Sequence, residues 1–211
     1  MPALVITAHG SSDPRFAAVV DDLAGIVRGE RPDLDVRIGY LDHGTPFETV
    51  TDADSVVVPV LLSNGYHVRE DIPGRFAGTV TPAVGPDRRL TLLLVRRLRE
   101  AGWAREPLTL AATGSADPRA LADVHQMARD LGDELGLDVP VGFISAGEPS
   151  LRELEPVAVA TYLLAPGAFS DSLIDSGAAI VAAPLGADPL IAEIILDRFD
   201  AAVSECATRR V

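Results

Sequence analysis

Short apolar runs alternate with longer amphipathic segments along the whole chain. Eight runs are nearly continuous in apolar residues and bounded by turn residues, a pattern typical of strands buried on both faces of a parallel sheet. They lie at 3–8, 35–41, 55–62, 79–84, 107–112, 138–144, 156–164 and 179–183. The intervening segments predict helices at 14–30, 46–52, 68–77, 87–101, 118–135, 149–154, 169–177 and 188–205. This alternation predicts an α/β fold.

The two halves of the chain repeat one pattern. Residues 4–15 and 108–119 share a strand, a Gly-Ser turn and an Asp-Pro-Arg helix start at an offset of 104, which drifts to about 101 later in the chain. Asp before Pro is a strong helix-start signal, because Asp caps the helix and Pro suits its first position. A repeat of this length indicates duplicated units. We expect two tandem, pseudo-symmetric α/β domains, each a four-stranded parallel sheet flanked by helices, at residues 1–105 and 106–211.

Three polar residues of the first half have no chemical counterpart in the second. These residues, all of types that can bind a metal, are His9, Asp42 and His67. The residues aligned with them in the second half are, in the same order, Thr113, Ser145 and Phe169. Because the scaffold residues survive and the metal-binding ones do not, the sequence predicts one active half and one structural, degenerate half.

These three residues each follow a predicted strand. Ligands of open parallel sheets bind at the carboxyl ends of the strands, near the point where the strand order reverses. In a 2-1-3-4 order the first three strands are neighbours about 4.8 Å apart. Side chains that leave their ends would then converge on one ion or small group.

The composition excludes several classes of protein. The 211 residues are 47% hydrophobic, and the single cysteine, Cys206, excludes a disulfide framework and a cysteine-based metal site. No apolar run approaches the roughly 20 residues of a membrane span. The N-terminus runs into a strand with no basic stretch before it, which is unlike a signal peptide. We expect a cytoplasmic protein without a membrane partner.

Charge is unevenly divided between the halves. The net charge is −13, with 12 Arg against 14 acidic residues in 1–105 and 6 Arg against 17 in 106–211. No basic stripe is present, so nucleic acid is not an expected partner. The near-neutral first half suits a small molecule rich in carboxylates, which Arg binds with a bidentate fork. Arg69 and Arg75 are candidates, because the aligned residues in the second half are not Arg.

Two other readings of the first turn are disfavoured. A histidine phosphatase also places a His-Gly pair after a strand, but its motif has Arg directly before the His, where this chain has Ala8. A dinucleotide-binding turn needs Gly-x-Gly-x-x-Gly after the first strand, and Gly10-Ser11-Ser12 does not supply it.

Three segments carry a resemblance to a known family. The His-Gly-Ser phrase at 9–11, the strand end at 59–62 and the Gly-Tyr-His-Val-x-x-Asp-Ile-Pro segment at 65–73 resemble the CbiX/SirB sirohydrochlorin chelatases, which are class II tetrapyrrole chelatases. The resemblance covers the whole chain, since longer family members also consist of two fused α/β halves. It implies a lyase-class enzyme that inserts a divalent metal into sirohydrochlorin, for cobalamin or sirohaem synthesis.

The resemblance also implies roles for individual residues. His9 and His67 would handle the metal and accept protons, and Asp42 would be a third metal ligand. The family usually has Glu at that place, one methylene longer, and the neighbouring His43 is an alternative ligand. Asp71 is interpreted as a helix-start residue or as a residue behind the ligands. Candidate substrate-binding residues are Gly10, Ser11, Gly65, Arg69 and Arg75.

Insertion of a metal into a tetrapyrrole displaces two pyrrole protons, and these residue types suit that task. Neutral imidazole binds borderline cations such as Co²⁺, Fe²⁺ and Ni²⁺ and takes up protons at cellular pH. The metal is then a substrate, and no tightly bound cofactor is expected. A non-catalytic metal or tetrapyrrole carrier would use the same residues. We expect a monomer, because the two halves are already joined covalently.

Overall fold

The buried apolar runs form two separate four-stranded parallel sheets in the computed structural model, which describes residues 2–209. The first sheet has the order β2-β1-β3-β4, and its strands are β1 (Leu4–Ala8), β2 (Val36–Tyr40), β3 (Val56–Pro59) and β4 (Thr79–Val80). The second has the order β6-β5-β7-β8, and its strands are β5 (Leu108–Gly114), β6 (Val141–Ala146), β7 (Ala158–Tyr162) and β8 (Ile180–Val181). The 2-1-3-4 order therefore occurs twice, which confirms the predicted fold class and repeat.

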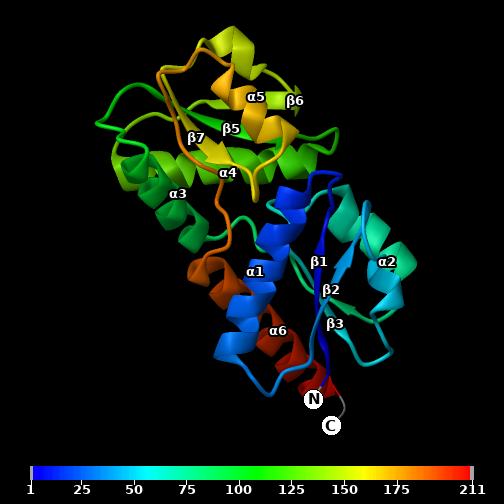
Figure 1. Ribbon diagram of the computed structural model, residues 1–211. Coiled ribbons are helices and arrows are strands. Elements are labelled where there is room, and N and C mark those ends of the chain that lie inside the picture. Colours follow the sequence, from blue (N-terminus) through cyan, green and yellow to red (C-terminus); the bar gives the residue numbers. More distant parts are fainter. Residues whose placement is uncertain (1, 210–211) are drawn as a thin grey trace. The chain divides into compact units, whose positions relative to one another are not determined.

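Helices and short helical turns follow the strands in the same order in both halves (Figure 1). In the first half these are α1 (Pro14–Glu30), the 3₁₀ turn η1 (Phe47–Thr49), the π-helical turn η2 (His67–Asp71), α2 (Ile72–Arg75) and α3 (Arg88–Glu100). In the second half they are α4 (Pro118–Leu135), the 3₁₀ turn η3 (Leu151–Leu154), α5 (Ala168–Ile174) and α6 (Pro189–Arg209). No helix among residues 2–209 is long and apolar enough to cross a membrane.

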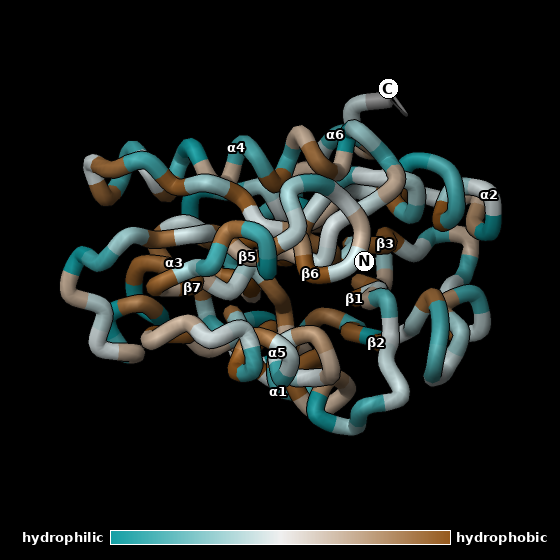
Figure 2. Tube along the Cα trace, turned by 90° about the horizontal axis from the view of Figure 1, so that it is seen from above, coloured by the Kyte–Doolittle hydropathy of each residue, from teal (hydrophilic) through white to brown (hydrophobic). Residues whose placement is uncertain are grey.

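The predicted starts of α1 and α4 are confirmed by their caps. The Asp13 carboxylate accepts the backbone N–H of Arg15 at 2.9 Å, and Asp117 accepts that of Arg119 at the same distance. Each cap satisfies one of the backbone donors that a helix start leaves free, which typically contributes about 1 kcal/mol. The pattern of α4 alternates between hydrophilic and hydrophobic residues along the helix, as Figure 2 shows.

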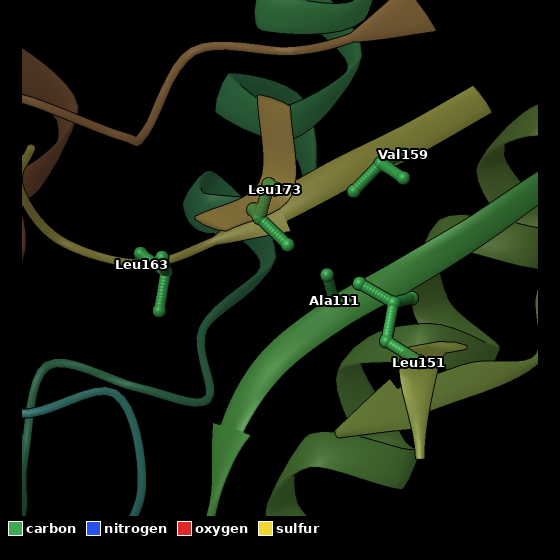
Figure 3. Close-up of a cluster of buried hydrophobic side chains, with 5 residues drawn as sticks. All are labelled: Ala111, Leu151, Val159, Leu163 and Leu173. Atoms are coloured by element: carbon green, nitrogen blue, oxygen red, sulfur yellow. The ribbon is translucent and has the colours of Figure 1, made fainter. Parts of the chain in front are cut away.

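Equivalent apolar clusters lie between each sheet and the short helices that follow its strands. In the first half Val5, Phe47, Val57 and Ile72 pack together. In the second half the cluster comprises Ala111, Leu151, Val159, Leu163 and Leu173, with Leu173 of α5 pointing toward Ala111 of β5 (Figure 3). The clusters fix the short helices against the sheets.

The compact units differ from the predicted domains of residues 1–105 and 106–211. One unit comprises 1–85 and 187–211, and the other comprises 86–186. Helix α3 packs on α4 and β7, whereas α6 packs on α1 and β3. The boundary at residue 105 is thus a boundary of the sequence repeat. Helix α3 of the first half belongs to the unit with the second sheet, and α6 of the second half belongs to the unit with the first sheet. Burial of apolar side chains explains this placement of α3. Its completely buried residues include Leu90, Leu93, Leu94 and Leu98.

The strand β4 is shorter than the predicted run at 79–84. Only Thr79 and Val80 pair with β3. Pro82 has no N–H group to donate to the ladder, so the regular strand ends before it, although the Val84 N–H still donates to the Pro59 carbonyl at 3.1 Å.

Candidate functional site

Two imidazoles meet at the carboxyl edge of the first sheet. His9 directly follows β1, and His67 opens η2 after β3, the strand beside β1. Their ring centroids lie 5.0 Å apart with an angle of 89° between the ring planes, so the rings meet edge to face. Both side chains are accessible to solvent, with 41% of the His67 side chain exposed. The predicted convergence of these two residues is confirmed.

A close backbone approach at Gly10 holds the ends of β1 and β2 together. Gly10 has a φ of +93°, and a Cβ atom added there would lie 1.7 Å from the carbonyl oxygen of Asp42. The Asp42 N–H donates to the His9 carbonyl at 2.8 Å. Gly114 repeats the arrangement with a φ of +88° and 1.6 Å to the carbonyl oxygen of Ala146. Because both halves contain it, the contact belongs to the scaffold.

The same comparison corrects one pairing between the halves. The sequence alignment places Ser145 opposite Asp42. In the structure the residue that approaches the glycine is Asp42 in the first half and Ala146 in the second, one residue beyond Ser145. The register between β5 and β6 shifts just before Gly114, which accounts for the difference.

The partners of the two histidines determine which ring nitrogens stay free. Nδ1 of His67 lies 2.9 Å from Oδ2 of Asp71, and Nδ1 of His9 lies 3.3 Å from the Gly10 carbonyl oxygen. An ionised carboxylate and a carbonyl only accept hydrogen bonds, so the neutral tautomer that fits these contacts carries its proton on Nδ1. Nε2 then carries the lone pair that can bind a metal or take up a proton.

Asp71 belongs to a chain of charges behind His67. Nη1 of Arg75 lies 3.6 Å from Oδ1 of Asp71, and Nε of Arg75 donates to Glu48 at 2.6 Å. The hydrogen bond from Arg75 lowers the pKa of Glu48, and Glu48 in turn raises the pKa of Arg75. The Arg75 guanidinium also lies 4.8 Å from the ring centroid of Phe47. These contacts hold Arg75 in place, and its expected role in binding substrate carboxylates stays a prediction.

Asp42 is not assembled with the two histidines into a three-ligand site. Its side chain is 64% exposed, and its carboxylate accepts the backbone N–H of His43 at 2.9 Å. Nε2 of His43 lies 3.5 Å from the same carboxylate. Within residues 2–209, no group of three or more His, Cys, Asp or Glu side chains is arranged to hold a metal ion. The structure therefore brings together two of the three predicted ligands.

The remaining predicted residues divide into scaffold and accessible groups. Ser11 accepts the N–H of Asp13 at 3.1 Å, just as Ser115 accepts that of Asp117 at 3.0 Å, which indicates a turn common to both halves. Gly65 is buried, and its carbonyl accepts two N–H groups at the start of η2. Arg69 is exposed and donates through Nε to the Asn64 carbonyl at 2.8 Å.

Three residues near the pair were missed by sequence reasoning. Glu48 joins the site through its hydrogen bond with Arg75, and its position on the chain gave no signal. Asn64 holds the loop after β4, because its amide donates to the Gly85 carbonyl at 2.9 Å and accepts the Ala83 N–H at 2.9 Å. Tyr66 is 57% exposed, with its ring centroid 5.8 Å from that of His67. The available signal was an aromatic residue directly before the candidate ligand His67.

Fold and site together define a class of protein: a duplicated α/β scaffold of the class II chelatase type, with a histidine pair at the sheet edge of one half. The chain belongs to the CbiX family, whose model matches it twice, over residues 3–101 and 107–202. The double match coincides with the internal repeat.

Similar proteins include chelatases of known sequence and structure. A sirohydrochlorin cobaltochelatase of Methanococcoides burtonii is 31% identical over 78 residues, which cover 33% of this chain and 60% of that protein. The chain thus spans about three-fifths of that relative's length. SirB from Bacillus subtilis with Fe³⁺ has a TM-score of 0.80 at 19% identity, covering 99% of this chain and 98% of SirB. The sirohydrochlorin chelatase SirB of B. subtilis subspecies spizizenii, in complex with cobalt, has a TM-score of 0.72 at 19% identity and covers 94% of both chains.

Proposed function

We propose that the protein is a sirohydrochlorin chelatase that inserts Co²⁺ or Fe²⁺, with Ni²⁺ as a further candidate. The observation that carries the proposal is the meeting of His9 and His67 at the sheet edge, with Nε2 of each ring free for chemistry. Membership of the CbiX family supports the substrate class, and relatives named for cobalt chelation or seen with Fe³⁺ and cobalt support the metals.

The reaction places two demands on the chain. The divalent metal must be held loosely enough to pass to the ring nitrogens, and two pyrrole N–H protons must leave as the two metal–nitrogen bonds replace them. Two neutral imidazoles meet both demands, because they bind borderline cations and also accept protons. Asp42 is proposed as a third ligand, and His43 is the alternative. Binding of one metal by all three would require the exposed Asp42 carboxylate to turn toward the pair.

Accessible groups around the pair suit an anionic tetrapyrrole. The exposed ring of Tyr66 offers an apolar face beside His67. Arg69 is exposed and presents a guanidinium on the same turn as His67, suited to a substrate carboxylate. We therefore assign Arg69 and Tyr66 to substrate binding.

The decisive experiment follows the absorbance of sirohydrochlorin with protein and Co²⁺ or Fe²⁺, against metal alone. His9→Ala and His67→Ala should each slow insertion by at least tenfold, since positioned acid–base groups contribute about 10²–10⁴-fold. The matched controls are Thr113→Ala and Phe169→Ala in the second half, which should insert metal at the wild-type rate. Binding of metal and sirohydrochlorin without turnover would identify a carrier instead.

A further inference from the structure

The helical turn after β3 contains one residue more than its counterpart after β7. Val68 and Ile72 are the buried residues of the first turn, four positions apart. Ser170 and Leu173 are the buried residues of the second, three positions apart. Ile72 and Leu173 occupy the same place in the two apolar clusters. The buried residues of the two turns are therefore equivalent, but three residues separate them in the first turn and two in the second.

The strands on either side confirm where the extra residue lies. Val56 of β3 and Ala158 of β7 occupy the same register in their sheets, at an offset of 102. Thr79 of β4 and Ile180 of β8 are the partners of those residues, at an offset of 101. Because Val68 and Ser170 keep the offset of 102, the insertion falls at positions 69–71, inside η2.

The local hydrogen bonding shows how the chain absorbs this residue. The N–H of Ile72 donates to the carbonyl of His67, five residues earlier, which is the bond of a π turn. The equivalent segment, Ala168–Ile174, is an ordinary α-helix. A π turn accommodates one extra residue within a helix, and such turns occur frequently at functional sites.

The extra residue changes which groups meet across the turn. In the second half Phe169 and Ser172 lie three positions apart, and the Ser172 hydroxyl donates to the Phe169 backbone carbonyl at 2.7 Å. In the first half the corresponding His67 and Asp71 lie four apart, and the Asp71 carboxylate contacts the imidazole itself at 2.9 Å. In the second half the side chain thus contacts the backbone carbonyl of Phe169, whereas in the first half, with the extra residue, it contacts the imidazole ring of His67.

We propose that this one-residue π insertion is what makes the first half chemically competent, because it places Asp71 against Nδ1 of His67. Asp71 is a positioning residue: it selects the tautomer with Nδ1–H and so keeps Nε2 of His67 free. Arg75, bound to Glu48, holds Asp71 from behind. The inference rests on the proposed function for the use of Nε2, whereas the tautomer itself is a property of the metal-free protein.

The first test is therefore made without metal. Imidazole ¹⁵N NMR of the wild-type protein at a pH where the ring is neutral should show a protonated Nδ1 and an unprotonated Nε2 for His67. Asp71→Ala should yield a mixture of tautomers, whereas Asp71→Asn, which retains an acceptor oxygen, should keep the wild-type pattern. An unchanged tautomer in Asp71→Ala would overturn the proposal.

The second test uses the absorbance of bound Co²⁺. Loss of a group that orients a metal-binding His typically weakens metal affinity about 10–100-fold. Asp71→Ala should show a loss of this size, and the matched Ser172→Ala variant should show none. Deletion of Glu70, which shortens the turn to the length found in the second half, should weaken Co²⁺ binding as much as His67→Ala. Wild-type affinity in a folded deletion variant would overturn the proposal. If the deletion variant does not fold, Asp71→Ala alone decides.

The two proposals fail in different ways. A wild-type protein that neither binds Co²⁺ nor inserts it would refute the proposed function, while the NMR result would still stand. A wild-type protein that inserts metal, with Asp71→Ala equally active and equally tight for Co²⁺, would refute only the role of the insertion.

Discussion

Replacement of Gly10 by Ala tests whether the contact between β1 and β2 supports the site. The φ of +93° is unfavourable for an L residue by about 1–2 kcal/mol. The new Cβ would also lie 1.7 Å from the Asp42 carbonyl oxygen, whereas ordinary contacts begin at 3.4 Å. The backbone must therefore shift by more than an ångström, and such overpacking costs about 1–3 kcal/mol. We expect a total loss of roughly 2–5 kcal/mol in the free energy of unfolding.

Thermal melting and Co²⁺ titration together provide the assay. For a chain of this size 1 kcal/mol lowers the melting temperature by about 2–4 °C, so Gly10→Ala should melt about 4–20 °C below the wild type. Affinity for Co²⁺ should also fall, because the Asp42 N–H holds the His9 carbonyl at 2.8 Å. Gly114→Ala is the matched control: its Cβ would lie 1.6 Å from the Ala146 carbonyl oxygen, so stability should fall equally while Co²⁺ affinity stays unchanged.

Two results would refute this reasoning. A free energy of unfolding for Gly10→Ala within about 0.5 kcal/mol of the wild type, the range of most surface substitutions, would contradict the first expectation. It would mean that the ends of β1 and β2 separate without cost. An equal loss of Co²⁺ affinity in Gly114→Ala would mean that the loss reflects stability alone.

Four further outcomes are expected. Gly25→Ala, at an exposed position of α1 with nothing within 4 Å of the new Cβ, should stabilise the protein by about 0.5–1 kcal/mol in thermal melts. Asp42→Ala should weaken Co²⁺ binding in calorimetry while Asp42→Glu retains it; unchanged affinity in Asp42→Ala would leave His43 as the third ligand. The Arg75 hydrogen bond lowers the pKa of Glu48 below its usual 4.5, so the pair stabilises the fold above that value and loses its contribution as the pH falls toward the lower folded-state pKa. The urea midpoint should accordingly fall less in Glu48→Gln than in the wild type between about pH 5 and about pH 3. Light scattering should give a mass near 22.2 kDa at all concentrations, and a persistent species of twice that mass would contradict the monomer.

The sequence was sufficient for the elements whose signals are local. Helices α1 and α4 begin where Asp-Pro predicts, because a cap and a proline act on their immediate neighbours. The packing partners of α3 and α6 were beyond reach. An amphipathic pattern shows that a helix has an apolar face, but it does not specify which sheet that face covers.

The site shows the same division between local and tertiary information. His9 and His67 were predictable because the second half retains their scaffold and loses their side chains. The π turn was not, since the apolar spacing at 68–77 is compatible with an ordinary helix. Glu48 was also missed, because its contact with Arg75 joins residues 27 positions apart. Asp42 lies at the predicted strand end, but its position did not indicate which way its exposed carboxylate would turn, so its role as a ligand stays a prediction.

The exchange of α3 and α6 has a consequence for the ancestry and the dissection of the chain. A half-length ancestor that lent its last helix to a second copy would have been an interlocked dimer, and gene fusion would have preserved that exchange. Neither fragment 1–105 nor fragment 106–211 then contains a complete fold, because each carries a helix that belongs to the other's sheet. Co-expressed, the two fragments should reconstitute the protein, whereas each alone should expose the apolar surface that its missing helix covers.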